Sequence, residues 1–169
     1  SDSRESLGLL GTETFDIVFT SYGTIGWLPD LKPWAKMISE RLKPGGVFYI
    51  VEFHPILWMF GYNEGNPEMK YHYNQKEVIY DEYEGTYADQ SSKMVSKEYG
   101  WNHGLSDVVN ALIEAGLQIE YLNEHDESPY DVFPDLIKTE DGMYKMENQL
   151  FPMIFEVKAN KKYKTAKKI

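Results

Sequence analysis

Two short apolar runs, at residues 15–21 and 47–53, flank a segment whose apolar residues recur at helical spacing. Each run is rich in β-branched and aromatic residues and is bounded by turn residues, which is typical of a buried strand. Asp30 is a candidate N-cap for the helix between them, and we expect Pro44-Gly45-Gly46 to end it. The helical positions are Leu31, Trp34, Ala35, Ile38 and Leu42. This order predicts a βαβ unit with parallel strands.

The rest of the chain divides into two loop-rich stretches and three regular elements. Residues 56–101 mix tyrosines, charges and turn residues, which indicates an inserted β-rich lid. A second amphipathic helix ends at Gly116, and strands are expected at 117–123 and 153–159. No crossover helix separates these two strands. We therefore expect a hairpin that puts an antiparallel final strand at one side of a mostly parallel, Rossmann-like α/β sheet.

Length and composition favour one folded domain over residues 1–169. The 169 residues are 42% hydrophobic and 15% aromatic, which describes a globular protein with a packed core. The absence of cysteine excludes disulfides and thiolate chemistry, and no apolar run is long enough to cross a membrane. The N-terminus does not read as a signal peptide, so the expected location is the cytoplasm.

The distribution of charge along the sequence indicates which kinds of binding partner to expect. The net charge is −10, and a Lys-rich tail at about 160–169 leaves the remainder still more acidic. A body this acidic repels nucleic acid, so we expect neither nucleic acid nor membrane as a partner. The four histidines are scattered over separate elements, and no spacing indicates a metal site.

Candidate chemistry gathers where the two parallel strands end. In an open α/β sheet, ligands bind beyond the carboxyl ends of the strands, which here carry Ser21-Tyr22-Gly23 and Glu52-Phe53-His54. With a period of two, Glu52 and His54 point to the same face. His54 is either a cap before Pro55 or a functional imidazole, and Glu52 is either structural or part of the site.

The residues of this unit resemble the second half of class I S-adenosylmethionine-dependent methyltransferases. The resemblance rests on Phe-Asp-Ile-Val-Phe at 15–19, Leu-Lys-Pro-Gly-Gly at 42–46 with the apolar strand that follows, and Ala-Gly-Leu at 115–117. Val-Glu-Phe-His-Pro at 51–55 and Tyr-Gly-Trp-Asn-His at 99–103 are similar to a bacterial small-molecule subgroup. The family implies methyl transfer from S-adenosylmethionine to a small-molecule acceptor.

The chain departs from the family at the cofactor cradle. These enzymes hold the cofactor in a Gly-x-Gly loop after a first strand, whereas no two of the thirteen glycines here are two positions apart. Laid on the family pattern, the chain begins just after the third strand. We therefore expect a fragment that lacks the N-terminal cofactor-binding strands and that is inactive alone if the missing half is required. The alternative is a naturally minimal protein.

The resemblance implies roles for particular residues. Asp2 matches the residue that addresses the adenine amino group, and Ser21, Tyr22 and Gly23 match the segment beside the methionine part of the cofactor. Trp27 falls near the transferring methyl, or else packs in the core. Trp27, Glu52 and Trp101 are the candidate substrate contacts. If the acceptor must lose a proton, His54 and His103 are the candidate bases, and a cap or surface role is the alternative for His103.

Two other functions compete with this interpretation. The strands of a non-catalytic α/β scaffold or interaction module would only support an interface. A nicotinamide-dependent oxidoreductase would need a glycine fingerprint that the sequence lacks. If the N-terminal half is absent, an unpaired strand edge predicts dimerisation or aggregation, and the homodimer would form through that edge.

Overall fold

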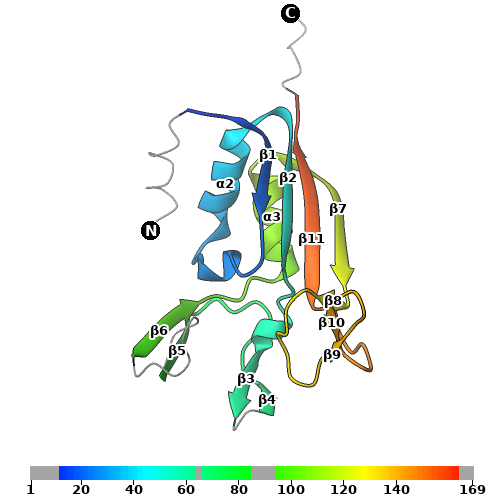
Figure 1. Ribbon diagram of the computed structural model, residues 1–169. Helices are drawn as coiled ribbons and strands as arrows, with labels where there is room; N and C mark the ends of the chain where they lie inside the picture. The colour runs from blue at the N-terminus through cyan, green and yellow to red at the C-terminus, as the bar shows by residue number, and fades with distance from the viewer. Residues whose placement is uncertain (1–11, 64–65, 85–93, 164–169) are drawn as a thin grey trace, which may run out of the picture.

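The computed structural model describes residues 12–63, 66–84 and 94–163. Its centre is a four-stranded sheet in the order β1-β2-β11-β7 (Figure 1), formed by β1 (Phe15–Thr20), β2 (Leu42–Phe53), β11 (Ile154–Lys161) and β7 (Leu117–His125). β1 and β2 are parallel, as the sequence predicts, and β11 is antiparallel to both β2 and β7. The fold is therefore α/β with a mixed sheet.

Helix α2 (Leu31–Arg41) joins the two parallel strands. Its N-cap is Asp30, as predicted, whose side chain accepts a hydrogen bond of 2.9 Å from the backbone of Lys32. The helix ends before Pro44-Gly45-Gly46, however, because Leu42 is already extended and pairs with Phe15 of β1. Leu42 is buried in the core, and Lys43, which precedes Pro44, is disfavoured in helical backbone, so the helix does not extend to the proline.

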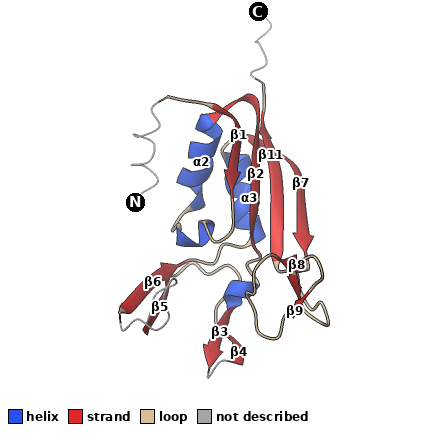
Figure 2. Cartoon of the chain, viewed as in Figure 1, coloured by secondary structure: helices blue, strands red, loops and turns tan. Residues whose placement is uncertain are grey.

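Helix α3 (Leu105–Glu114) precedes β7 and is closed by Gly116, as predicted, with a φ of +86° that suits glycine. Both helices pack on the same face of the sheet (Figure 2). On this face, alternate side chains of β2 and β11 pack against the two helices. The buried core of this layer includes Leu31, Trp34, Ala35, Ile38, Phe48, Ile50, Val108, Leu112, Phe155 and Val157.

The opposite face of the sheet has no helix over it in the described part of the chain (Figure 1). Ile17 and Phe19 of β1 point there and are 67% and 58% exposed, and the Phe19 ring stacks on Tyr49 of β2. Among the described strands β1 pairs only with β2, so no described strand lies along its outer edge. An apolar surface and a strand edge therefore lie together on one side of the protein.

The final strand does not lie at one side of the sheet, contrary to the prediction. β11 forms the expected antiparallel pair with β7, but it also inserts between β7 and β2. Its side chains explain this position, because Ile154, Phe155, Val157 and Ala159 are all buried. Such a strand gains most by pairing along both edges. β11 includes Asn160 and Lys161, which the sequence assigns to the tail, and residues 164–169 lie outside the described part.

The predicted lid consists of a short 3₁₀ helix and two antiparallel strand pairs that project from one end of the sheet (Figure 2). The elements are η2 (Leu57–Met59), β3 (Phe60–Asn63), β4 (Asn66–Met69), β5 (Ile79–Glu84) and β6 (Val95–Gly100). Residues 125–149 add a small three-stranded sheet from β8 (Glu127–Ser128), β10 (Tyr144–Lys145) and β9 (Ile137–Lys138). No helix in the described residues is long and apolar enough to span a membrane.

Candidate functional site

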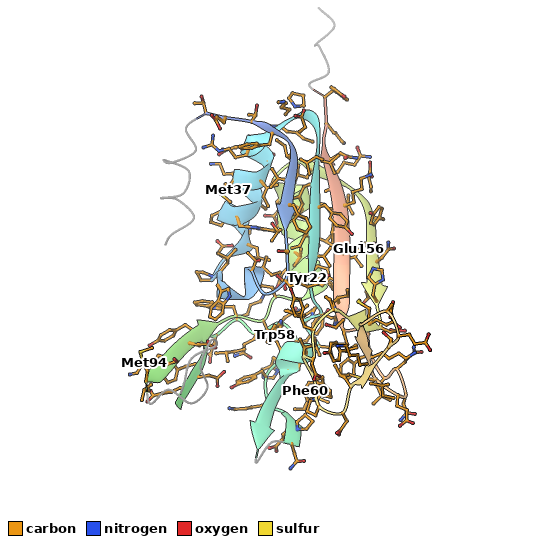
Figure 3. All side chains as sticks on the ribbon, viewed as in Figure 1. Tyr22, Met37, Trp58, Phe60, Met94 and Glu156 are labelled. Atoms are coloured by element: carbon orange, nitrogen blue, oxygen red, sulfur yellow. The ribbon has the colours of Figure 1, made fainter. Side chains whose placement is uncertain are left out.

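A cavity of about 530 Å³ lies between the carboxyl ends of β1 and β2 and the lid, a size that suits a small-molecule ligand. Figure 3 shows Trp58 and Phe60 of its wall in the lid region, below the tip of β1 near Tyr22. The residues that line the cavity are Gly23, Ile25, Gly26, Trp27, Glu52, Phe53, Pro55, Leu57, Trp58, Phe60, Gly61, Lys70, Tyr71, Ile79, Asp81, Glu82, Glu98, Gly100, Trp101, Asn102, His103 and Val132. The position matches the ligand site expected of an open α/β sheet.

The side chain of Glu52, at the end of β2, is hydrogen-bonded to the turn that follows β1. Its side chain is 2% exposed, and its carboxylate accepts hydrogen bonds from the backbone N–H groups of Gly23, of Thr24 at 2.8 Å and of Ile25 at 3.4 Å. Gly23 has a φ of +72°, a conformation that glycine adopts without a steric penalty. The buried carboxylate therefore holds the turn after β1 and forms part of the cavity wall at the same time.

Ser21 and Tyr22 lie beside the cavity without lining it. Ser21 is exposed, and its carbonyl accepts the Thr24 hydroxyl. The Tyr22 ring packs at 5.4 Å from both Phe53 and Tyr130, and burial, followed by the neighbouring Tyr130 and Glu52, raises the pKa of its hydroxyl. Of the predicted cofactor contacts in the described residues, only Gly23 reaches the wall; Asp2 lies outside the described residues.

His54 is buried on the far side of β2 from this turn, towards β7. Its Nε2 atom lies 2.8 Å from a Glu124 carboxylate oxygen, and its Nδ1 atom accepts the backbone N–H of Ile56 at 3.2 Å. Burial lowers the pKa of this imidazole, although Glu124 acts in the opposite direction. With both ring nitrogens engaged and no position in the cavity wall, His54 has the surroundings of a structural residue.

His103 lines the cavity, as its place beside the lid predicts. Its Nε2 atom lies 2.7 Å from the carbonyl oxygen of Leu28, which assigns the ring proton to Nε2 and leaves a lone pair on Nδ1. Burial lowers the pKa of this imidazole, so the neutral form predominates at pH 7. A neutral imidazole with a lone pair is able to accept a proton.

Tryptophans form much of the apolar wall. Trp27 is 55% exposed, so it is a surface of the cavity and not a residue of the core. Trp101 also lines the cavity, and its backbone N–H donates to the Gly26 carbonyl at 2.9 Å, which fastens the lid to the β1 loop. Trp58 packs edge-on against Phe53 at 5.9 Å between ring centres.

Asn102 is a cavity residue to which the sequence gives no role. It is 1% exposed, and its Nδ2 group donates to the carbonyl oxygens of Pro55 at 3.0 Å and His72 at 3.2 Å. Its Oδ1 atom is buried and accepts no hydrogen bond from the described residues. The sequence signal for Asn102 is its position between Trp101 and His103, which are both candidate site residues.

The charged groups around the cavity are mostly acidic. Its wall contains four carboxylates, from Glu52, Asp81, Glu82 and Glu98, and one lysine, Lys70. No group of three or more histidine, aspartate or glutamate side chains in the described residues is arranged to hold a metal ion. The cavity therefore combines negative charge, aromatic faces and a buried polar acceptor, without a cluster suited to metal coordination.

Comparison with known proteins finds a likeness in structure only. No protein-family model and no curated protein sequence matches the chain. A proposed S-adenosylmethionine-dependent methyltransferase from Listeria monocytogenes superposes over 90% of the chain with a TM-score of 0.55 at 14% identity. Methyltransferases of the same description from Mesorhizobium loti and Clostridium acetobutylicum superpose over 89% and 90%, with TM-scores of 0.51 and 0.52 at 18% and 14% identity.

These structures are longer than the chain. It covers 64%, 63% and 60% of them, respectively, which is less than two thirds in each case. At sequence identities this low, the superpositions establish a shared fold and nothing more. They leave the chemistry to be argued from the cavity itself.

Proposed function

We propose that this chain is part of an enzyme that transfers a methyl group from S-adenosylmethionine to a small-molecule acceptor. The observation that carries the proposal is the cavity at the carboxyl ends of two parallel strands, in a fold shared with S-adenosylmethionine-dependent methyltransferases. Its volume of about 530 Å³ suits a small acceptor. The whole protein's activity is part of this proposal, because the chain covers less than two thirds of those structures.

The residues at the tip of β1 fit the sulfonium end of the donor. S-adenosylmethionine supplies a methyl carbon that is activated by a positively charged sulfur. Glu52 places negative charge next to the turn, and Trp27 offers an aromatic face, both of which attract such a cation. We assign Gly23 and Trp27 to this end of the donor. For the adenosine, the resemblance implies only Asp2, which lies outside the described residues, and the sequence has no Gly-x-Gly loop to add to it.

The chain's contribution to catalysis is mainly placement. Methyl transfer is a displacement in which the acceptor atom must lie close to the methyl carbon, in line with the bond that breaks. Trp27, Trp58 and Trp101 hold the acceptor and limit the water around it. His103 accepts a proton at Nδ1 when the acceptor must lose one. His54 supports the site through its bonds to Glu124 and Ile56.

Calorimetry tests this function. S-adenosylmethionine and S-adenosylhomocysteine are titrated into this chain and into the full translated product of its gene, including any residues encoded upstream of Ser1. Binding to either protein, weakened at least tenfold by Gly23→Val, supports the proposal. The absence of binding in both proteins refutes it.

The exposed surface of β1 favours a second candidate, an interaction module. Ile17 and Phe19 form an apolar surface beside an edge that pairs with no described strand. In that case β1 pairs with a second copy of the chain, and the sheet serves as a scaffold. The two candidates differ in their ligands, because a scaffold has no affinity for S-adenosylhomocysteine.

A further inference from the structure

One side of the cavity is backed by a second hydrophobic cluster, separate from the core between the helices and the sheet. Leu57 is buried in this cluster together with Met146 and Met153, and Phe53 and Val132 pack against it. Leu57, Phe53 and Val132 also line the cavity, so they lie between the cluster and the space for a ligand. This part of the cavity wall is therefore continuous and supported from behind.

Two further aromatic residues extend the same part of the wall. Trp58, which is 45% exposed, packs edge-on against Phe53 at 5.9 Å between ring centres. Phe60 packs against Phe133 at 5.1 Å and Phe151 at 5.9 Å, and these two residues pack against the second cluster. Close packing behind the wall holds its shape. We call the following cavity residues the aromatic wall: Phe53, Leu57, Trp58, Phe60 and Val132.

The aromatic wall adjoins the end of the cavity that we assign to the methyl donor. A Cβ atom added at Gly23 would lie 3.8 Å from Cε2 of Phe53, so the Phe53 ring lies next to the turn after β1. The acceptor atom must lie close to the methyl carbon, and its surroundings therefore include this ring. The group that receives the methyl is placed against an apolar surface.

This placement disfavours a charge on the reacting group. The aromatic wall contains no charged side chain, and apart from Glu52 the carboxylates and the lysine that line the cavity come from residues 70–98 of the lid. An ion bound against the wall would lose hydration without gaining a partner there. A cationic group would in addition be repelled by the positive sulfur of the donor. An uncharged group attached directly to an aromatic ring meets neither cost.

Val132 is placed to limit the size of a bound ring. Of residues 125–149, which the structure describes in full, only Val132 lines the cavity. It is half-buried, with the second cluster packed against it. A larger side chain at this position has little room on the side of the cluster and extends into the cavity.

We infer that the methyl acceptor is a small aromatic compound whose reacting group is an uncharged hydroxyl or amino group on the ring, and that Val132 limits the size of the ring system. This inference rests on the proposed function and names the substrate class of the same site. The acceptor ring packs on Phe53 and Trp58, because aromatic rings stabilise one another in edge-to-face and offset contacts.

The transfer is balanced in atoms and electrons. A lone pair of the ring oxygen or nitrogen forms a bond to the methyl carbon as the carbon–sulfur bond breaks, and the electrons of that bond neutralise the sulfonium as a thioether. The proton of the hydroxyl or amino group passes to Nδ1 of His103 or to water. The product is an uncharged methyl ether or N-methylamine, and no oxidant or reductant is consumed.

The first test compares ligands that share two rings and differ in charge. Calorimetry measures the binding of 2-naphthol, 2-naphthylamine, 2-naphthoate and 2-naphthylmethylammonium to the full translated product of the gene. The protein is saturated with sinefungin, an unreactive analogue of S-adenosylmethionine that carries a positive amine in place of the sulfonium. We expect the naphthol and the naphthylamine to bind about tenfold more tightly than either ion. An ion that binds as tightly as both neutral ligands overturns the inference.

The second test changes the size of residue 132. Val132→Phe should weaken the binding of 2-naphthol about tenfold and that of phenol much less, because the added ring takes up space that only the larger ligand needs. Ile137→Phe is the matched control, since Ile137 is an exposed residue of β9 in the same stretch and does not line the cavity. It should change neither affinity.

A smaller side chain at the same position gives the opposite change and does not crowd the fold. Val132→Ala should improve the binding of the three-ring ligand 9-phenanthrol several-fold relative to 2-naphthol. Thermal denaturation confirms that each variant is folded. An unchanged ratio of the two affinities in Val132→Ala contradicts the assignment of Val132, even if Val132→Phe does not fold.

The inference and the proposed function fail in different ways. If the protein binds S-adenosylhomocysteine but none of the aromatic ligands, the acceptor class is wrong and the function stands. If 2-naphthol displaces S-adenosylhomocysteine, the ring occupies the donor end and the inference is overturned. If nothing binds, both are refuted. Simultaneous binding of 2-naphthol and S-adenosylhomocysteine supports the inference.

Discussion

The buried carboxylate of Glu52 accepts the backbone N–H of Gly23, so the end of β2 holds the turn that follows β1. The same carboxylate accepts Thr24 at 2.8 Å, and both Glu52 and Gly23 line the cavity. The wall of the site is therefore a consequence of the parallel strand pair. Any ligand bound at the tip of β1 depends on this contact.

Replacing Glu52 by glutamine should destabilise the protein. The amide puts an NH₂ group where a carboxylate oxygen accepts backbone donors, which removes a charge-assisted hydrogen bond at a buried position. We expect the free energy of unfolding to fall by about 2 kcal/mol, measured by urea denaturation. Glu68→Gln, on the exposed surface of β4, should change it by less than about 0.5 kcal/mol. An unchanged urea midpoint for Glu52→Gln would show that the contact is not stabilising.

His54 should make the protein less stable as the pH falls. Burial lowers its pKa in the folded state, so the unfolded chain takes up the proton first as the pH falls. The free energy of unfolding should therefore decrease below about pH 6.5, until the folded-state pKa is reached. His103 acts in the same direction because burial also lowers its pKa.

Denaturant titrations of wild type and His54→Asn between pH 7.5 and 5 measure this dependence. The variant should be less stable at pH 7.5 and should lose less stability on acidification. His72→Asn is the control, because His72 is exposed. Parallel pH curves for wild type and His54→Asn would contradict the assignment.

Gly104→Ala should loosen the lid. A methyl group at this position would lie 2.7 Å from the Tyr73 ring and closer still to Asn74, and the Tyr73 hydroxyl accepts the Leu105 N–H at 3.4 Å. We expect trypsin to cut after Lys76 several-fold faster and the free energy of unfolding to fall by about 1 kcal/mol. Gly100→Ala is the matched control, because its methyl group would have an ordinary contact of 3.6 Å with the Gly26 carbonyl. Equal cleavage rates in the two variants would refute the proposed packing.

The sequence predicted the framework of the site better than its details. The βαβ unit, the Asp30 cap and the Gly116 cap are local patterns, and the structure confirms each. The position of β11 between β2 and β7 was missed because it depends on pairing along both edges, which alternation along one strand does not report.

Some site residues were also predictable from the sequence, whereas others depend on the three-dimensional packing. Glu52 and Gly23 follow from their places at the strand ends, and the structure brings them together. His54 was placed at the pocket because of its position in sequence, but Glu124, seventy residues away, turns it towards β7. Asn102 stands out only through an unpaired oxygen, which is a property of three-dimensional packing.

The apolar surface of β1 should promote self-association. Phe19 is 58% exposed next to an edge that pairs with no described strand, so we expect light scattering to detect dimers or larger species at high concentration. Phe19→Lys should shift the protein towards the monomer, because a lysine on an edge strand resists pairing. Lys36→Ala, on the exposed side of α2, is the control. A wild-type monomer at all concentrations would exclude pairing through this edge.

The most direct test of the central claim is photochemical labelling with S-adenosylmethionine that carries an isotopic label in its methyl group. The full translated product of the gene is irradiated with the bound donor, digested, and the labelled peptide is identified by mass spectrometry. We predict that label attaches to the peptide containing Gly23 and Trp27, and that excess S-adenosylhomocysteine abolishes it. Label confined to peptides outside the cavity, or no protectable label at all, would contradict a methyl-transfer site at the tips of β1 and β2.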